Sequence, residues 1–485
     1  MHRDFCPNES QSPLIDKIRK IRKNMKLKIN DFGAIDQGTI DLSKRINLLC
    51  GPNGTGKTYF SYLIYGLLRN KLHIKGYEDV ARRLFNDRQV VMDIDFEDVQ
   101  HYRDEMLKDT KSDMDILFGI STDTKDKIFK NCNISFDESI EEFKDRIFTS
   151  SIKTILEIHN MNVELEKSSN SMSIVLRIID ESIPSDMMQV FSYVLYSSIL
   201  YALAIYPISK VQVFPVERNS IYTFSKELSI RKQEAIDSIQ LLADREKKIN
   251  RIDLLFNTMN SRRYPLPIRD GLLIAEDLAE IKKNKSVFFS FAEEMEDELL
   301  HGKVQISNDG EIQFVPEKAR RIALPIQMSA SIVKTLSSLI VYLKHIANEN
   351  DLIIIDEPEI NLHPSNQVIL ARILARLANR GFRLLVSTHS DYIIREFNNL
   401  IMLSNRNNET IQKIREENGY NSEEYINLSD INVHSFRYKG KTSKKVSVTP
   451  VKIDKFGFSI EIIDNVIERM NEVADKLYYA TKYGN

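Results

Sequence analysis

A glycine-rich loop between two mostly apolar runs dominates residues 44 to 68. It has the pattern GxxxxGKT and consists of Gly51, Pro52, Asn53, Gly54, Thr55, Gly56, Lys57 and Thr58. The runs Ile46 to Cys50 and Tyr59 to Leu68 predict a buried strand before the loop and a helix after it. Such a loop turns its amide N–H groups inward, toward a phosphate at the positive end of the helix. This stretch predicts nucleotide binding, with Lys57 at the terminal phosphates and the Thr58 hydroxyl as a Mg²⁺ ligand.

Composition excludes several other classes of protein. The chain has 485 residues, 42% hydrophobic and 28% charged, which is enough for a large core and more than one structural unit. Its net charge of -2 gives no overall attraction to nucleic acid or to an anionic membrane, so any DNA contact would be local. The cysteines form no CxxC pair, which argues against a zinc knuckle or a disulfide framework. Because the basic residues before Met25 have no signal-type apolar core beside them, we expect a cytoplasmic protein.

Two other stretches each admit two interpretations. Asp93 and Asp95 could bind Mg²⁺ in a Toprim nuclease, but they lack a companion glutamate, which favours an ordinary strand with exposed acids. Met187 to Ser209 carries no formal charge and is long enough to span a bilayer as a helix. Its tyrosines and serines are scattered, whereas membrane helices gather tyrosine at their ends. We therefore expect a helix buried in the protein and no membrane partner.

Two apolar strands in the C-terminal half end in polar residues. In LIIIDEPE (Leu352 to Glu359), the aspartate could hold Mg²⁺ and the adjacent glutamate could orient and polarise the attacking water. In LLVSTHS (Leu384 to Ser390), the histidine could contact the γ-phosphate or the water; a lone histidine is more often structural, but this setting favours a catalytic or switch role. The predicted catalytic residues are Glu357, His389 and Lys57, and the predicted metal ligands are Thr58 and Asp356.

Ser329 and Ser331 lie where a third helix is expected to begin. Serines at a helix N-terminus offer hydroxyl and N–H groups to an anion, and ordinary N-capping is the alternative. A basic run at Arg437 to Lys445 is expected to be a solvated hairpin turn, with DNA or partner contact as the alternative. Ile460 to Tyr479 predicts a final amphipathic helix.

Taken together, these residues resemble the ABC-type ATPase heads of the SMC and RecF group, in which a signature helix precedes the DE strand. Within that group the chain is most similar to bacterial defence ATPases: the overcoming-lysogenization-defect family and the ATPase subunits of the PARIS and Septu anti-phage systems. The resemblance rests on FPVERN at Phe214 to Asn219, MSASIVKTLSSL at Met328 to Leu339 and INLHP at Ile360 to Pro364. The signature segment has Ser329, Ala330 and Ser331 at the position where transporter-type heads have a Ser-Gly-Gly core. Gln89 and Gln100 both remain candidates for a Q-loop glutamine.

The resemblance implies an α/β P-loop NTPase of ABC-ATPase head type with an inserted helical arm, using ATP and Mg²⁺. ATP would lie between Lys57 of one subunit and Ser329 and Ser331 of another, in a homodimer or higher oligomer with slow ATPase activity. The implied partners are an effector nuclease, held or released by the switch, and a phage-encoded trigger. A RecF-like DNA-repair ATPase, which would bind DNA in a salt-sensitive way, and a self-contained nuclease are the alternatives. A transporter motor fits poorly, because the P-loop and the DE motif normally lie closer together in the sequence of such a protein.

These features predict five segments. They are a basic lead-in (1–24), the N-terminal half of the head with the P-loop (25–224), a helical insertion (225–300), the C-terminal half with the signature helix, Walker B strand and switch histidine (301–403), and a C-terminal extension (404–485).

Overall fold

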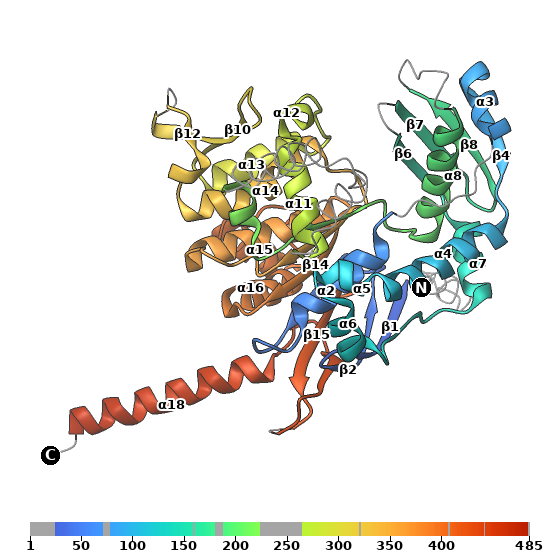
Figure 1. The fold of residues 1–485 in the computed structure, drawn as a ribbon. Coiled ribbons are helices and arrows are strands. Elements are labelled where there is room, and N and C mark those ends of the chain that lie inside the picture. The colour runs from blue at the N-terminus through green and yellow to red at the C-terminus, as the bar shows by residue number, and fades with distance from the viewer. Residues whose placement is uncertain are drawn as a thin grey trace, which may run out of the picture.

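The computed structural model describes most of the chain. The described residues are 25–70, 78–158, 161–179, 188–223, 264–319, 322–405, 408–440 and 442–483. The expected lead-in, residue 224, and residues 225–263 of the expected helical insertion lie outside them. Figure 1 shows a mixed α/β body with a smaller sheet on one side and one long helix extending from it. The expected α/β class is confirmed.

A nine-stranded sheet forms the centre of the body, in the order β5-β1-β2-β16-β15-β3-β14-β13-β9. Five neighbouring strands at one end of this order run parallel. They are β15 (Ile431–Tyr438), β3 (Ile46–Cys50), β14 (Arg383–Thr388), β13 (Leu352–Asp356) and β9 (Val211–Phe214). Strands β3, β13 and β14 are buried at every position, as their apolar runs require for parallel strands covered on both faces. Their carboxyl ends meet at one edge of the sheet.

The other end of the sheet contains antiparallel pairs. Strands β1 (Lys26–Phe32) and β2 (Ile35–Asp41) form a hairpin, and β5 (Asn133–Phe136) pairs with β1. Strand β16 (Val446–Pro450) joins β15 to β2. Residues 404–485 therefore contribute two strands to the central sheet and are more than an extension of it.

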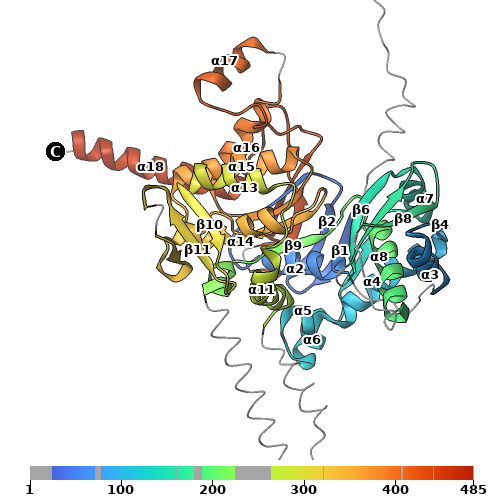
Figure 2. The same ribbon diagram turned by 90° about the horizontal axis from the view of Figure 1, so that it is seen from above.

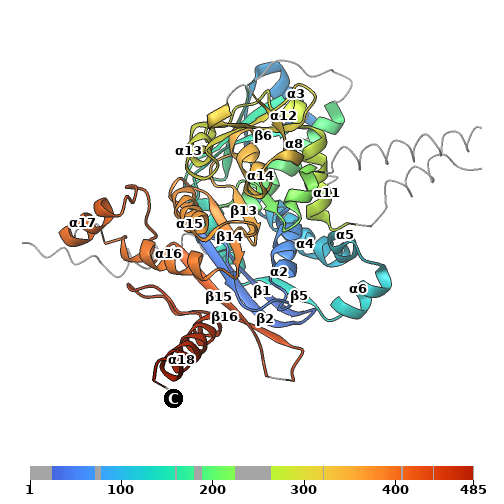
Figure 3. The ribbon, with the colours of Figure 1, turned by 90° about the vertical axis from the view of Figure 1, so that its left-hand side faces the viewer.

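Helices cover both faces of this sheet. In Figure 3, α2 (Lys57–Leu68) lies on one side of β13 and β14, and α15 (Pro364–Asn379) and α16 (Asp391–Met402) lie on the other. Successive residues of β13 point to opposite faces, so that Ile354 joins the core under α2 while Ile353 and Ile355 join the core under α15. The two cores hold the carboxyl ends of the parallel strands in fixed register.

A four-stranded sheet forms a second unit, seen beside the central sheet in Figure 2. It contains β4 (Gln89–Asp93), β8 (Ser173–Ile178), β7 (Met161–Lys167) and β6 (Ile152–Ile158). The uncharged run forms α8 (Met188–Ala204), whose Phe191, Leu195 and Ile199 are buried. The expectation of a buried helix is confirmed, and no helix among the described residues is both long and apolar enough to cross a membrane.

The acidic pair after β4 has a structural explanation. Asp93 accepts a hydrogen bond from the Ser173 hydroxyl, and Asp95 is the N-cap of α4 (Phe96–Ser112), where it accepts from the Glu97 N–H at 2.9 Å. No group of three potential metal-ligating histidine, cysteine or acidic side chains occurs in the described parts of the chain. The geometry favours the reading of this pair as strand-end and capping residues.

The remaining elements lie around these two sheets. Strands β10 (Gly302–Ile306) and β11 (Ile312–Pro316) form an antiparallel hairpin, which β12 (Leu324–Pro325) extends to three strands. The described helices not yet given are α3 (Glu78–Asp87), α5 (Met114–Phe118), α6 (Thr122–Phe129), α7 (Ile140–Thr149), α11 (Leu266–Glu276), α12 (Leu278–Ile281), α13 (Phe289–Leu299), α14 (Ser331–His345), α17 (Glu409–Glu417), α18 (Glu461–Tyr483) and the 3₁₀ turns η2 (Glu317–Ala319) and η3 (Ile326–Met328).

The expected final helix is confirmed as α18, which projects away from the body in Figure 1 and Figure 3. Its first turn is anchored, because Ile460 is buried in the core and Ile463 packs against it. Beyond that turn most of its large apolar side chains are exposed, with Met470 66% and Leu477 63% accessible.

Candidate nucleotide site

The glycine-rich loop connects β3 to α2 at the carboxyl edge of the parallel strands. Gly56, which precedes the first residue of α2, has φ of 89°, in the left-handed region that favours glycine. Gly51 is required for a different reason. A Cβ atom there would lie 2.4 Å from the carbonyl oxygen of Phe436 on β15, a contact with backbone that no side-chain movement relieves. The tertiary packing of β15 thus explains the first glycine of the motif.

Lys57 lies beneath this loop and is only 6% exposed. Its ammonium group donates hydrogen bonds to the carbonyl oxygens of Gly51, at 2.9 Å, and Pro52, at 3.0 Å. Burial lowers the pKa of Lys57, and the nearby carboxylates of Asp356 and Glu357 oppose that change. The side chain is therefore held as a point charge against the loop, where the terminal phosphates are expected to bind.

Thr58 and Asp356 meet although 298 positions separate them in the sequence. The Thr58 hydroxyl donates to one carboxylate oxygen of Asp356 at 2.6 Å, and the Ser387 hydroxyl donates to the other. Asp356 is 1% exposed, so the carboxylate is fixed by these two contacts. Hydroxyl and carboxylate oxygens are suitable Mg²⁺ ligands, so these two residues fit the ion that accompanies ATP. When bound, Mg²⁺ would neutralise charge on the β- and γ-phosphates.

Glu357 follows Asp356 in a strained backbone conformation, with φ of 47°. Its N–H donates to the carbonyl oxygen of Ser387 at 3.1 Å, and its side chain remains about one-third exposed. Burial, and then the neighbouring Asp356, raise the pKa of Glu357, which strengthens it as a base. An accessible carboxylate beside the Thr58–Asp356 pair is the arrangement that a water-orienting residue needs.

His389 lies next to Glu357, with Nε2 of the histidine 3.6 Å from Oε1 of the glutamate. Burial and the nearby Lys57 lower the pKa of His389 to about 4. The imidazole is therefore neutral near pH 7, and the approach to Glu357 is not an ion pair. A neutral imidazole can still exchange hydrogen bonds with water or a phosphate oxygen at this position.

A third acid of the DEPE run, Glu359, holds the histidine loop in place. Its carboxylate accepts hydrogen bonds from the His389 N–H at 2.6 Å and the Thr388 hydroxyl at 2.8 Å. Ser390 caps α16 and donates to the side chain of Gln367 at 2.6 Å. Sequence reasoning did not assign a role to Glu359, although its place in the same acidic run was a visible signal.

Ser329 and Ser331 lie at the start of α14, but neither caps that helix. The N-cap residue is Ala330, which has no side-chain capping hydrogen bond. Ser329 is nearly buried and its hydroxyl donates to the carbonyl oxygen of Pro325 at 3.2 Å, whereas Ser331 is exposed. Ordinary N-capping thus does not explain these serines. The hydrogen bonds described for them are local, and none of these joins them to the P-loop of the same chain.

The two Q-loop candidates belong to the smaller unit. Gln89 lies on β4 and accepts a hydrogen bond from Arg177 at 3.3 Å, and Gln100 lies within α4. The structure gives neither residue a contact with the P-loop among those described.

The β15–β16 hairpin brings the basic run close to the P-loop. The Tyr438 hydroxyl donates to the carbonyl oxygen of Gly54 at 3.0 Å. Lys439 and Lys445 pair with acids of the β1–β2 hairpin, Asp36 and Asp31 respectively. These two lysines are therefore neutralised within the chain, which weakens the alternative that the hairpin binds DNA.

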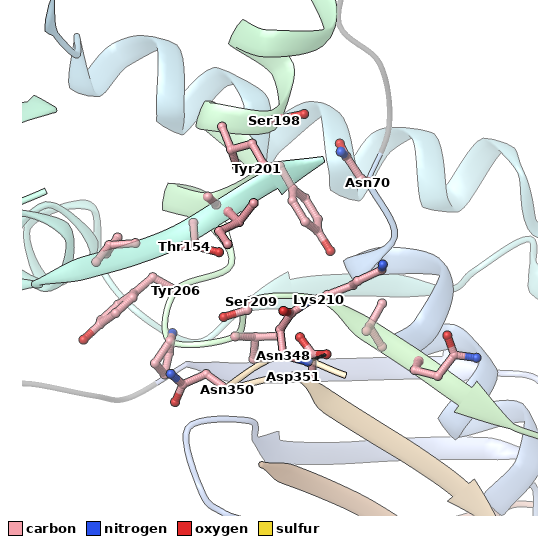
Figure 4. A pocket seen from close by; sticks show the side chains of 18 of the residues that line it. Asn70, Thr154, Ser198, Tyr201, Tyr206, Ser209, Lys210, Asn348, Asn350 and Asp351 are labelled. Carbon is pink, nitrogen blue, oxygen red and sulfur yellow. Dashed lines mark hydrogen bonds between the residues drawn. The ribbon is translucent and has the colours of Figure 1, made fainter. Parts of the chain in front are cut away.

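A cavity of about 410 Å³ lies at the opposite ends of β9 and β13 from the nucleotide site. Figure 4 shows Tyr201 on α8 above the side chains of Asn348 and Asp351, which precede β13. None of the predicted site residues lines this cavity. The nucleotide site and this cavity are thus separate features at the two ends of the same strands.

Comparison with known proteins supports the family suggested by this geometry. The family model for an AAA ATPase domain matches residues 25–394. The chain is similar in structure to an SMC head bound to the C-terminal winged-helix domain of ScpA, with 12% identity, a TM-score of 0.38, and 89% of this chain and 98% of that one covered. It is also similar to the Smc head from Pyrococcus furiosus bound to the C-terminal domain of ScpA, with 13% identity, a TM-score of 0.36, and 93% and 99% covered.

A third similar structure is the SMC head domain from Thermotoga maritima, with 10% identity, a TM-score of 0.29, and 89% of this chain and all of that one covered. No curated protein sequence matches the chain significantly. The family model spans well over half of the chain and includes the P-loop, Asp356, Glu357 and His389. The chain therefore belongs to the AAA ATPase domain family.

Proposed function

We propose that this protein is an ATP-driven switch that hydrolyses ATP slowly and changes its association with other chains when it does so. The observation that carries this proposal is the 2.6 Å contact between Thr58 and Asp356, which joins the two distant halves of the chain, with the partly exposed Glu357 beside it. Lys57 and the loop N–H groups would bind the phosphates, Thr58 and Asp356 would hold Mg²⁺, and Glu357 would orient the attacking water. His389 would assist from the next strand.

The switch is proposed to work between two heads. Ser329 and Ser331 form no described hydrogen bond with their own P-loop, and the uncapped start of α14 leaves N–H groups for an anion. In the proposed pair, ATP lies between Lys57 of one head and these serines of the other. Fluorescence energy transfer between donor- and acceptor-labelled chains tests this. We expect transfer to rise with MgATP but not with MgADP; equal transfer in both would contradict the head pair.

The proposed biological role is control of a separate effector, most simply a nuclease, in bacterial defence against phage. Its support is the resemblance of FPVERN, the signature segment and INLHP to defence ATPases. The role would be tested by co-expressing the chain with nuclease-encoding neighbours of its gene and challenging the cells with phage. Protection that requires both genes and an intact Glu357 is the expected result, and protection by the nuclease alone would count against the role.

The purified chain is expected to cut neither DNA nor RNA. The acids outside the nucleotide site that most resemble a nuclease pair, Asp93 and Asp95, are engaged with Ser173 and the start of α4. Plasmid and tRNA would be incubated with the protein in Mg²⁺ or Mn²⁺, with and without ATP. The control carries Asp93→Asn and Asp95→Ser, which remove both carboxylates and keep a capping oxygen. Cleavage by the wild type that this variant lacks would establish a self-contained nuclease.

We also propose that α18 joins two copies of the chain permanently, by packing against α18 of the second copy. Its apolar residues recur at intervals of three and four. Those beyond the anchored first turn are Val466, Met470, Val473, Leu477 and Ala480. Arg469 and Lys476 flank this stripe on one side and Ile467 and Ala474 on the other. In an antiparallel pair the basic residues would face those of the partner, whereas in a parallel pair they face the uncharged flank, so the charges favour parallel copies.

Introducing charge into this stripe is expected to separate the chains. The double change Met470→Asp and Leu477→Asp should raise the dissociation constant for self-association at least about a hundredfold, because each buried side chain contributes roughly 2 kcal/mol. Light scattering without nucleotide measures the mass. Asn471→Asp, which adds a carboxylate on the polar face, is the matched control and should leave the mass unchanged. Equal masses for the double variant and the control would show that α18 does not join copies.

A further inference from the structure

Arg218 is a buried cation at the centre of the nucleotide-site scaffold. It lies in the turn after β9 and is 3% exposed. Its guanidinium donates to four backbone carbonyl oxygens: Thr335 at 3.2 Å, Pro215 at 2.9 Å, Asp356 at 2.7 Å and Glu357 at 2.8 Å. No carboxylate oxygen accepts from Arg218 among the hydrogen bonds described. A cation this deeply buried is normally paired with a carboxylate. The hydrogen bonds described for Arg218 instead go to backbone carbonyl oxygens, which suggests a role in holding the backbone.

The guanidinium connects three separate elements. The carbonyl groups belong to the turn after β9, to α14 and to the end of β13. The planar fork of an arginine spreads its N–H donors over several nitrogen atoms and so reaches carbonyl groups on separate elements, whereas the ammonium group of a lysine donates from a single nitrogen. Burial lowers the pKa of Arg218 to about 10, so the group is still a cation at neutral pH. The charge of Arg218 also lies near the carboxylates of Asp356, Glu357 and Glu359, which oppose the lowering of its pKa.

One of these contacts fixes the peptide that directs Glu357. The left-handed φ of 47° at Glu357 is unfavourable for a residue with a side chain. This conformation is held from both sides: the Glu357 N–H donates to Ser387, and the Glu357 carbonyl accepts from Arg218. Weakening either contact would let the peptide rotate and would move the carboxylate away from the water that it is proposed to orient.

Another contact reaches the signature helix. Thr335 lies one turn after Ser331, and its hydroxyl donates to the Ser331 carbonyl at 3.0 Å. Arg218 binds the carbonyl of Thr335, so it is attached to the turn of α14 that carries Ser331. The same side chain therefore touches the helix that would meet the partner's nucleotide and the peptide that carries Glu357 at its own nucleotide.

We propose that Arg218 is a positioning residue that couples the two ATP sites of a head pair, by joining the position of α14 to the orientation of Glu357. This inference rests on the proposed head pair. Binding of ATP against Ser329 and Ser331 of one head would move or steady α14, and Arg218 would transmit that change to Glu357 of the same head. Hydrolysis at each site would then depend on the occupancy of the other.

The test is Arg218→Lys, which keeps the charge and loses the fork. We expect turnover to fall at least about tenfold, because a displaced catalytic group reduces rate steeply. Affinity for a fluorescent non-hydrolysable ATP analogue should stay within about twofold, because the P-loop is untouched. The Hill coefficient of hydrolysis should fall from above one in the wild type to one. Arg376→Lys is the matched control, since Arg376 is 2% exposed but pairs with Glu298 on another face.

A double-variant cycle separates coupling from simple structural loss. If Arg218 acts through α14, then Ser331→Ala should slow turnover in the wild type but have little further effect in Arg218→Lys. Fully additive losses, or a variant that loses only thermal stability while its turnover and Hill coefficient match those of Arg376→Lys, would overturn the inference. A wild-type Hill coefficient of one with normal turnover would also overturn it and leave the ATPase intact. Absence of ATP-dependent energy transfer in the wild type would instead refute the head pair itself, and the coupling with it.

Discussion

Replacing Glu357 with glutamine is expected to lower ATP turnover at least about a hundredfold while ATP still binds, because a general base contributes that much or more. The amide cannot accept a proton from water, whereas Lys57, Thr58 and Asp356 remain in place to hold the nucleotide. Phosphate release measures turnover, and titration with a fluorescent analogue measures affinity. Since hydrolysis would open the head pair, the state with high energy transfer should accumulate in MgATP.

The matched control for this variant is Glu349→Gln. Glu349 is exposed before the first residue of β13, so the change removes the same charge from the other end of the strand. Its turnover should equal that of the wild type. Wild-type turnover in Glu357→Gln would mean that the base lies elsewhere, and His389, which is 3.6 Å from Glu357, would become the leading candidate.

The pH dependence of turnover follows from the same site. The pKa of Glu357 is raised by burial, and the ionised form is the base, so turnover should be full above that pKa and decline as pH falls through it. His389 has its pKa lowered to about 4, so it should add no transition near pH 6.5. The acidic decline of the wild-type rate should be missing from the residual rate of Glu357→Gln.

Replacing Lys57 with alanine is expected to weaken ATP binding at least about a hundredfold, because loss of one partner of a buried charge contact costs roughly 2–5 kcal/mol. The variant also leaves the carbonyl oxygens of Gly51 and Pro52 without the hydrogen bonds that Lys57 donates. Titration with a fluorescent ATP analogue measures the loss, and circular dichroism checks that the variant is folded.

Lys44→Ala is the control for this second variant. Lys44 donates to the carbonyl oxygen of Ser429 at the far end of β3, away from the loop, so its removal should leave ATP affinity unchanged. A folded Lys57→Ala protein with wild-type affinity would show that the glycine-rich loop is not the nucleotide site.

The residues of the candidate site could be picked out from the sequence because each of its motifs is local. A GxxxxGKT loop between an apolar strand and a helix predicts the strand-loop-helix geometry of a P-loop. The acids at 356 and 357 and the histidine at 389 lie at the ends of apolar runs. Strand ends of a parallel sheet lie at one edge, so these residues were expected to meet. The P-loop class, the buried α8 and the final helix required no knowledge of distant contacts.

Other features depended on contacts between residues far apart in the chain. Strand β15 pairs with β3 across almost the whole sequence, and short strands of this kind carry no signal for which neighbour they choose. That pairing places the Phe436 carbonyl against Gly51, so that a side chain at position 51 would collide with the backbone of β15. The left-handed backbone of Glu357 and the four carbonyl contacts of Arg218 are likewise absent from any local pattern.

The sequence by itself thus indicated the P-loop, the acids and the histidine of the candidate site, since side-chain chemistry and the period of apolar residues are properties of short segments. Tertiary structure alone decided which strands are neighbours, which backbone carbonyl groups the buried Arg218 binds and which apolar helix face remains exposed. The physical reason is that strand pairing and burial depend on the packing of the whole core, in which many weak contacts between distant residues add up to one arrangement.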